Sequence, residues 1–345
     1  MKAAIYNPYL DTLGGGERYT MAFASVLTNA NFQVDVCWKD KEIIEQLKNR
    51  FGIQLKNISI VDDIKLGDGY DLCFWVSDGS IPLLHARKNI LHFQIPFTGV
   101  DGRSLFNKMK LMRIEKVVCN SLFTKKVVDE EYDFASKSVV INPPVDTKKF
   151  KAKRKENIIV YVGRFSDLVQ NKRQDILIDA FETFSKSINN NWQLVLMGGI
   201  EVGTRDELMV NLRAKAANLN VKIIESPSFN QIIDIVGRAR FFWSASGYGV
   251  DEGAEPVKVE HFGITTAEAM SAGVVPLVYD AGGQKSIVED GVSGFVWARV
   301  EELVSITEKV ISQGLIVKIA KEAQKRAERY SYANFERNVR GILGI

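Results

Sequence analysis

Two glutamates, Glu260 and Glu268, stand eight positions apart in the stretch EHFGITTAEAM. The pattern predicts a helix that begins near Gly263 or Ile264, so the backbone N–H groups of Phe262, Gly263 and Ile264 have no intrahelical acceptor. Such first-turn donors attract an anion. Glu260 would then face a ligand just before the helix, and Glu268, one turn in, could accept hydrogen bonds from two vicinal hydroxyls. The alternative is that both acids only complement the helix dipole or stay solvated.

Three cations follow a predicted strand in the stretch YVGRFSDLVQNKRQD. Arg164 stands at the end of the strand, and Lys172 and Arg173 come just before the next predicted helix. Fixed cations at the carboxyl end of a strand can neutralise a diphosphate, which carries about two negative charges. The alternative is a surface loop with ordinary charges.

Glycine-rich loops occur at two further strand ends. In NPYLDTLGGGERY, Gly15 and Gly16 lead into a predicted helix, where backbone N–H groups can approach an anionic ligand. The spacing lacks the G-x-G-x-x-G pattern of dinucleotide enzymes, which disfavours a nicotinamide site. The second loop contains Gly282, Gly283 and Gln284. Each loop could contact a ligand or only form a tight turn.

The elements that must position these residues form two series of short apolar strands that alternate with helical segments. Strands are predicted at 2–7, 34–38, 58–61, 71–76, 89–94, 116–121 and 138–144, and again at 157–164, 192–199, 221–226, 240–246, 274–280 and 294–298. Such alternation is typical of parallel, doubly wound α/β domains.

The segment PPVDTKKFKAKRKEN separates the two series and has the composition of a linker. We therefore expect an acceptor-binding domain at 1–150 and a donor-binding domain at 151–326. A C-terminal helix at 327–345 could pack on either domain, including back on the first. The strand carboxyl ends of the two domains are expected to face an interdomain cleft, since parallel α/β sheets bind ligands at that edge.

Composition excludes several classes of protein. The chain has 345 residues, 46% of them apolar and 25% charged, and a net charge of +3. This charge does not argue for nucleic acid as a partner. No apolar run is long enough to span a membrane, and no signal peptide is evident at the start. We expect a cytoplasmic protein, with contact to the inner face of the membrane left open. The histidines and cysteines show no metal-ligand spacing, so no metal site is expected.

The segment 103–126 has a different charge balance from the rest of the chain. It holds seven Lys or Arg residues and one acid, Glu115, beside apolar residues at helical spacing. One interpretation is a solvated helix that covers its own domain. The other is a basic amphipathic surface that meets an anionic membrane or an anionic acceptor.

Four ordered motifs together resemble a known family. EHFGITTAEAM resembles the E-x7-E motif of the family 4 retaining glycosyltransferases, which have the two-domain GT-B fold, and VGRFSDLVQNK resembles their diphosphate motif. VINPPVDTKKF and GGQKSIVEDGVSGFVW are similar to the interdomain and closing segments of the family. NPYLDTLGGGER is similar to the opening of mannosyltransferases that extend lipid-linked oligosaccharides.

The resemblance implies transfer of a hexose, with mannose favoured, from a GDP- or UDP-linked donor to a glycan or lipid-linked acceptor. Retained anomeric configuration, no cofactor and no metal ion are implied as well. Carried over residue by residue, it assigns catalytic roles to Glu260, Arg164 and Lys172, donor contacts to Gly15, Gly16, Arg173, Phe262, Gly263, Ile264, Thr265 and Glu268, and the acceptor side to His92 and Gln94.

Two other functions remain open on the sequence alone. One is a non-catalytic partner subunit that binds a nucleotide sugar or a glycan, and the other is a GT-B-like nucleotide-sugar epimerase. The presence of Glu260, Arg164, Lys172 and Glu268 argues against the first, because a non-catalytic relative is expected to have lost such residues.

Overall fold

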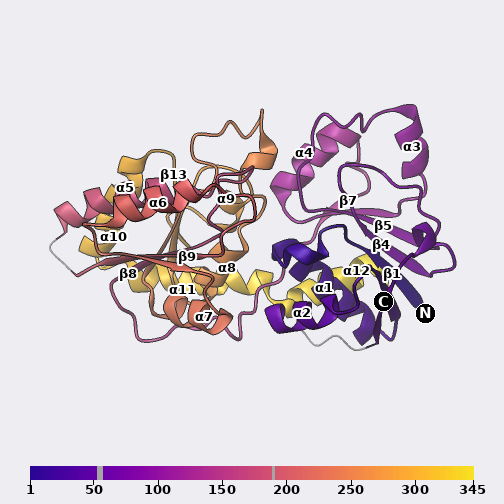
Figure 1. Ribbon diagram of the computed structural model, residues 1–345, viewed down its shortest axis with the longest axis horizontal. Helices are drawn as coiled ribbons and strands as arrows, with labels where there is room; N and C mark the ends of the chain where they lie inside the picture. Colours follow the sequence, from indigo (N-terminus) through magenta and orange to yellow (C-terminus); the bar gives the residue numbers. More distant parts are fainter. Residues whose placement is uncertain (53–56, 189–190) are drawn as a thin grey trace. The chain divides into compact units, whose positions relative to one another are not determined.

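The computed structural model describes residues 1–52, 57–188 and 191–345. The chain forms two compact units, shown in Figure 1. Unit 1 comprises Met1–Pro144 and Tyr332–Ile345, and unit 2 comprises Val145–Ser331. The first boundary therefore lies six residues before the expected position at 150.

Unit 1 is built on a parallel sheet with the strand order β3-β2-β1-β4-β5-β6-β7. Its strands are β1 Lys2–Tyr6, β2 Gln33–Cys37, β3 Ile58–Val61, β4 Leu72–Val76, β5 Lys88–Phe93, β6 Lys116–Cys119 and β7 Ser138–Val140. Its helices are η1 Leu10–Thr12, α1 Gly15–Asn29, α2 Ile43–Phe51, η2 Lys65–Gly67, α3 Leu105–Leu111, α4 Leu122–Tyr132 and α12 Tyr332–Leu343. The chain order reverses between β1 and β4.

Unit 2 repeats the arrangement with the order β10-β9-β8-β11-β12-β13, again all parallel. Its strands are β8 Ile158–Val162, β9 Gln193–Gly198, β10 Val221–Glu225, β11 Phe241–Ser244, β12 Val275–Tyr279 and β13 Phe295–Trp297. Its helices are α5 Gln174–Ser187, α6 Asp206–Ala216, α7 Phe229–Arg238, η3 Pro256–Lys258, α8 Ile264–Ser271, α9 Gln284–Ile287, α10 Val300–Ser312, α11 Ile316–Ala327 and η4 Glu328–Tyr330. The prediction of two doubly wound parallel sheets is confirmed.

The helix α12 belongs to unit 1 although it follows all of unit 2 in the sequence (Figure 1). Phe335, Val339 and Leu343 on one face of α12 join the apolar core that α1 and α2 also form. The Phe335 ring meets Tyr19 of α1 edge-on, at 5.1 Å between ring centroids. Lys88 Nζ donates to the Leu343 carbonyl at 2.8 Å, which fixes the end of the helix.

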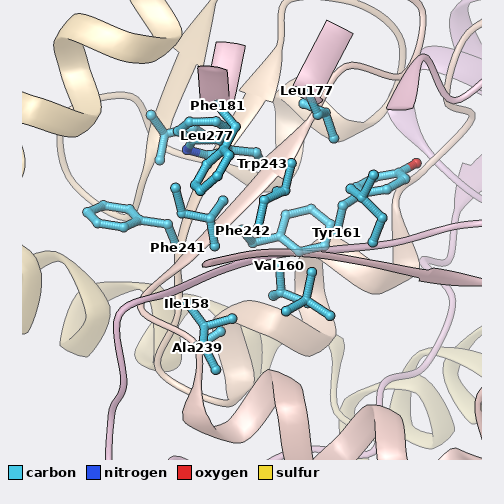
Figure 2. Packing of buried hydrophobic residues seen from close by; sticks show 14 of the residues in the cluster. Ile158, Val160, Tyr161, Leu177, Phe181, Ala239, Phe241, Phe242, Trp243 and Leu277 are labelled. Carbon is cyan, nitrogen blue, oxygen red and sulfur yellow. The ribbon is translucent and has the colours of Figure 1, made fainter. Parts of the chain in front are cut away.

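The core of unit 2 lies between the sheet and the helices around it, among them α5, α7 and α10. Figure 2 shows Trp243 of β11 close to Phe181 of α5 and Leu277 of β12. On the opposite face of β11, the centroid of the Phe242 ring lies 5.7 Å from that of the Tyr161 ring. Tyr161 of β8 lies at the edge of this cluster, with its hydroxyl directed away from the other labelled side chains. Both central strands are buried along their whole length, which explains their continuously apolar sequences.

Among the described residues, none of the helices has the length and apolar character needed to cross a membrane.

Candidate functional site in unit 2

A largely buried ion pair joins two of the predicted residues across 88 positions of sequence. Lys172, in the loop before α5, donates from Nζ to Glu260 Oε2 at 2.8 Å, and the two side chains are 9% and 22% exposed. Burial alone would raise the pKa of Glu260, but the Lys172 ammonium, His261 and the backbone N–H of Phe262 together hold it below its usual value. Glu260 is therefore an ionised hydrogen-bond acceptor at neutral pH.

Gln170 and His261 lie beside this pair and are linked to it by hydrogen bonds. Gln170 Nε2 donates to the Val259 carbonyl at 2.9 Å and lies 2.9 Å from His261 Nε2. Its Oε1 accepts from Lys172 Nζ at 3.3 Å. Sequence reasoning missed Gln170, since a lone glutamine in a polar loop carries no pattern.

The helix α8 begins as predicted, at Ile264, after Gly263 in a left-handed conformation with φ 105°. The N–H groups of Thr266 and Ala267 bond to the Gly263 carbonyl at 3.1 and 3.3 Å. Those of Ile264 and Thr265 lie in the first turn, where a helix offers no internal acceptor. Further along α8, Glu268 is only 6% exposed, in a run of six buried residues.

Two glycines of the loop after β12 lie against the backbone of Glu260 and His261. The Gly283 N–H donates to the Glu260 carbonyl at 2.6 Å. A Cβ on Gly282 would lie 2.2 Å from the Glu260 carbonyl oxygen, and one on Gly283 would lie 2.1 Å from that of His261. Only glycine permits this approach of one backbone to another. Glu252 fixes the loop in turn, because its Oε2 accepts from the Gly282 N–H at 2.6 Å.

The two predicted arginines differ in their surroundings. Arg164 follows β8, is half exposed, and pairs through Nη1 with Glu201 Oε1 at 2.7 Å. Arg173 binds Asp175 through Nε and Nη2, donates to the Tyr248 carbonyl at 3.1 Å and lies over the Tyr248 ring. Arg173 is therefore held by its own loop, whereas Arg164 is half exposed and pairs with the partly buried Glu201 carboxylate.

Tyr161 is a second neighbour of Glu260 that sequence reasoning missed. Its hydroxyl lies 3.0 Å from Ser246 Oγ, which joins the ends of β8 and β11. Burial and, to a lesser degree, the Glu260 carboxylate raise the pKa of Tyr161. The chain order reverses between β8 and β11, and parallel α/β sheets bind ligands at such a point.

In unit 1, Gly15 begins α1 and Gly16 allows Gln94 to approach the helix start. A Cβ on Gly16 would lie 1.9 Å from Gln94 Oε1. This oxygen is buried, and no described residue donates a hydrogen bond to it. Glu17, itself buried, accepts from the Gly14 N–H at 2.8 Å and from Thr12 Oγ1 at 2.6 Å. The glycine loop is thus bonded to its own helix through Glu17.

His92 lies inside the core of unit 1 and is fully buried. Its ring stacks on Tyr19 at 4.2 Å, and Nδ1 lies 2.9 Å from the Val118 carbonyl. Burial lowers the pKa of His92 to about 3, so the ring is neutral at physiological pH. Its position does not support the expected place on the acceptor side, because a fully buried ring offers no surface to an acceptor.

Comparison with known proteins gives one family. The family model described as "Glycosyl transferases group 1" matches residues 144–332. A Neurospora crassa GDP-Man:Man(3)GlcNAc(2)-PP-Dol alpha-1,2-mannosyltransferase is 27% identical over 221 residues, which are 57% of this chain and 37% of that protein. The Staphylococcus aureus capsular polysaccharide biosynthesis glycosyltransferase CapH is 22% identical over 264 residues, 66% of this chain and 70% of CapH.

The chain thus spans little more than a third of the fungal relative. Among solved structures, a glycosyltransferase from Rickettsia africae superposes with a TM-score of 0.78 at 17% identity, covering 99% of this chain and 98% of that one.

Proposed function

The chain belongs to the glycosyl transferases group 1 family and has the GT-B fold, and on this premise we propose that it transfers a hexose from a nucleoside diphosphate sugar with retained anomeric configuration. Mannose from GDP-mannose is the favoured sugar, because the fungal relative is named for that donor. The observation that carries the proposal is the largely buried pair between Lys172, before α5, and Glu260, before α8.

The proposed donor contacts follow from the charges in unit 2. Glu260 accepts hydrogen bonds from the sugar hydroxyls, oriented by Lys172 and by Gln170. The N–H groups at the start of α8 and the Arg164 guanidinium stabilise the diphosphate as it leaves. Glu268 holds the ribose diol. The partly exposed Arg164–Glu201 pair contributes only about 0–1 kcal/mol, so a diphosphate can replace Glu201 at small cost.

Retention needs no protein base in this scheme. A phosphate oxygen of the leaving group takes the proton of the acceptor hydroxyl on the face from which the diphosphate departs. The cations that the scheme requires are Arg164 and Lys172. We therefore propose that the reaction proceeds without a metal ion.

Slow release of nucleoside diphosphate without acceptor tests the proposal. With GDP-mannose and UDP-glucose as probes, at least one is expected to be cleaved. Arg164→Ala and Glu260→Ala are each expected to lower the rate by about 10²-fold, because Arg164 stabilises the leaving diphosphate and Glu260 positions the donor sugar. Chromatography of the released nucleotide measures the rate, and excess EDTA should leave it unchanged.

Arg213→Ala is the matched control for Arg164→Ala. Arg213 is also an arginine of unit 2, is 57% exposed against 51% for Arg164, and also pairs with a glutamate, Glu225. Its replacement should leave the rate at the wild-type value. Equal rates for wild type, Arg164→Ala and Glu260→Ala would refute the transferase. Binding of both probes without cleavage would instead indicate a non-catalytic nucleotide-sugar-binding subunit.

We further propose that the acceptor is lipid-linked and that α3 meets an anionic membrane surface. Four apolar side chains at this helix are largely exposed: Leu105, Phe106, Met109 and Met112, at 78%, 66%, 61% and 81%. Lys108 and Lys110 lie among them, and Lys110 Nζ is 4.4 Å from the centre of the Phe106 ring. Exposed apolar residues interleaved with cations are typical of interfacial helices.

Lys108→Gln with Lys110→Gln is expected to weaken binding to vesicles of phosphatidylcholine and phosphatidylglycerol by about tenfold or more, since each cation contributes about 1 kcal/mol near an anionic surface. Co-sedimentation measures the bound fraction. Lys318→Gln with Lys321→Gln, on α11, makes the same charge change at exposed positions and should bind as wild type does. Equal binding by both double variants would disprove the membrane contact.

A further inference from the structure

A cavity of about 660 Å³ opens in unit 1 and takes no part in the donor contacts proposed above. Its lining comes from the ends of β1, β2 and β4, the loop that follows β3, and His85. We name it the β1–β4 cavity; its residues used below are Tyr6, Trp75, Asp63, Lys65, Asp68 and His85. The volume falls within the roughly 300–1,000 Å³ of sites that bind small molecules.

The topology of unit 1 explains why this space is open. The helices α1, α2 and α12 cover one face of the sheet. On the other face, α3 and α4 supply core residues that pack with β4, β5 and β6. Tyr6, Cys37 and Trp75 are only partly buried on that second face, and beside them lies the loop after β3, which contains the short helix η2. The cavity also lies at the carboxyl ends of β1 and β4, where the strand order reverses.

The floor of the β1–β4 cavity is aromatic. The rings of Tyr6 and Trp75 stack across the β1–β4 pair, with 3.8 Å between centroids and 21° between planes. Both side chains line the cavity and are half-buried. The two rings cover each other on one side, so each offers its outer face and its edge as an apolar surface against which the C–H groups of a pyranose ring can pack.

The rim is polar, and its charges select against most other ligands. Two carboxylates, Asp63 and Asp68, stand against one ammonium, Lys65, so an anion is disfavoured. A purely apolar ligand would displace water from these charged groups without offering them a hydrogen bond. Among the described residues, no three His, Cys, Asp or Glu side chains gather as a metal site. Carboxylates beside an aromatic floor suit a neutral ligand rich in hydroxyls.

The loop that supplies the rim is held in an unusual backbone conformation. Lys65 and Leu66 are consecutive non-glycine residues with φ of 47° and 52°, a region that L-residues rarely occupy. The loop is fixed by the His85 N–H, which donates to the Leu66 carbonyl at 2.9 Å, and by Asp63 Oδ1, which accepts from the Lys65 N–H at 2.7 Å. Strain of this kind concentrates at ligand-binding segments.

We propose that the β1–β4 cavity binds one or two neutral pyranose residues of the glycan acceptor. The inference rests on the proposed transferase function, for which it supplies an acceptor subsite. The sugar ring lies against Trp75 and Tyr6, and its hydroxyls donate to Asp63 and Asp68.

Saturation-transfer NMR with methyl α-D-mannopyranoside and with cellobiose tests the proposal on the full chain. At least one probe is expected to receive saturation from the wild-type protein. Trp75→Ala is expected to weaken binding by about tenfold, because it removes the larger ring of the floor. Asp63→Asn with Asp68→Asn changes only exposed side chains and should weaken binding by at least threefold, which covers the case in which Trp75→Ala fails to fold.

Leu122→Ala, at an exposed apolar residue of unit 1 outside the cavity, is the control and should bind as wild type does. No transfer to either probe, or equal transfer in wild type and in both cavity variants, would overturn the proposal. Nucleoside diphosphate release is measured on the same preparations. If the sugar probes bind but no donor is cleaved, the proposed transferase function is wrong and the glycan site is supported. If a donor is cleaved but neither sugar probe binds, only the proposed glycan site is wrong.

Discussion

Lys172→Met is expected to lower donor cleavage by two to three orders of magnitude and to destabilise the protein by about 3 kcal/mol. The ammonium lies 2.8 Å from Glu260 Oε2, and both side chains are largely buried. Removing the cation leaves a carboxylate in a poorly solvated position, so stability falls, and the carboxylate also loses the group that orients it. Urea unfolding and the release assay measure the two effects.

A double variant separates the two causes. The double variant Lys172→Met with Glu260→Gln contains no unpaired buried charge. It should therefore regain most of the stability that Lys172→Met loses, while donor cleavage stays low. Lys153→Met is the control, because its Nζ also lies 2.8 Å from a carboxylate, Asp234, but at a largely exposed position. It should cost under about 1 kcal/mol. Full activity in Lys172→Met would remove this lysine from the proposed mechanism.

The Lys172–Glu260 pair also predicts that the free energy of unfolding decreases in acid. The pKa of Glu260 is lowered in the folded protein, so its contribution to stability is present above the ordinary glutamate pKa of about 4.3 and is lost as pH falls through the folded value. The stability difference between wild type and Glu260→Gln should therefore shrink below about pH 4.

Gly283→Ala is expected to lower donor cleavage by about 10²-fold and stability by about 3 kcal/mol. The new Cβ would lie 2.1 Å from the His261 carbonyl oxygen and 2.6 Å from its carbon, both backbone atoms that cannot rotate away. The backbone at Glu260 and His261 must shift, and the Glu260 carboxylate shifts with it. Gly283 has φ −73°, a value that alanine adopts without strain. Any loss of activity or stability therefore comes from the contact between the new Cβ and the His261 carbonyl.

The control for this variant is Gly341→Ala in α12, where no atom lies within 4 Å of a new Cβ. Alanine favours a helix over glycine by up to about 1 kcal/mol, so this change should be neutral or stabilising. If Gly283→Ala retains wild-type cleavage and stability, the loop after β12 does not position Glu260.

The fold could be predicted from sequence because each strand is marked twice, by apolar content and by the polar loop that follows it. The predicted strand at 58–61 matches β3 to the residue. The start of α8 was predictable for a local reason as well, because Gly263 can adopt the positive φ that precedes Ile264.

The contacts of the site were harder to predict, because they join residues far apart in sequence. No local sequence pattern predicts that Lys172 binds Glu260 or that Gly283 lies against the His261 carbonyl. His92 illustrates the opposite error. The family resemblance placed His92 on the acceptor side, but its ring stacks on Tyr19 inside the core of unit 1.

The position of α12 has a consequence for the order in which the protein matures during translation. Phe335, Val339 and Leu343 complete the core of unit 1, and the ribosome adds them after all of unit 2. Domains commonly fold while the chain is synthesised, at about 5–20 residues per second. The half translated first therefore keeps an apolar face open to chaperones until the other half has emerged, so unit 2 can reach its native state while unit 1 still waits for its last helix.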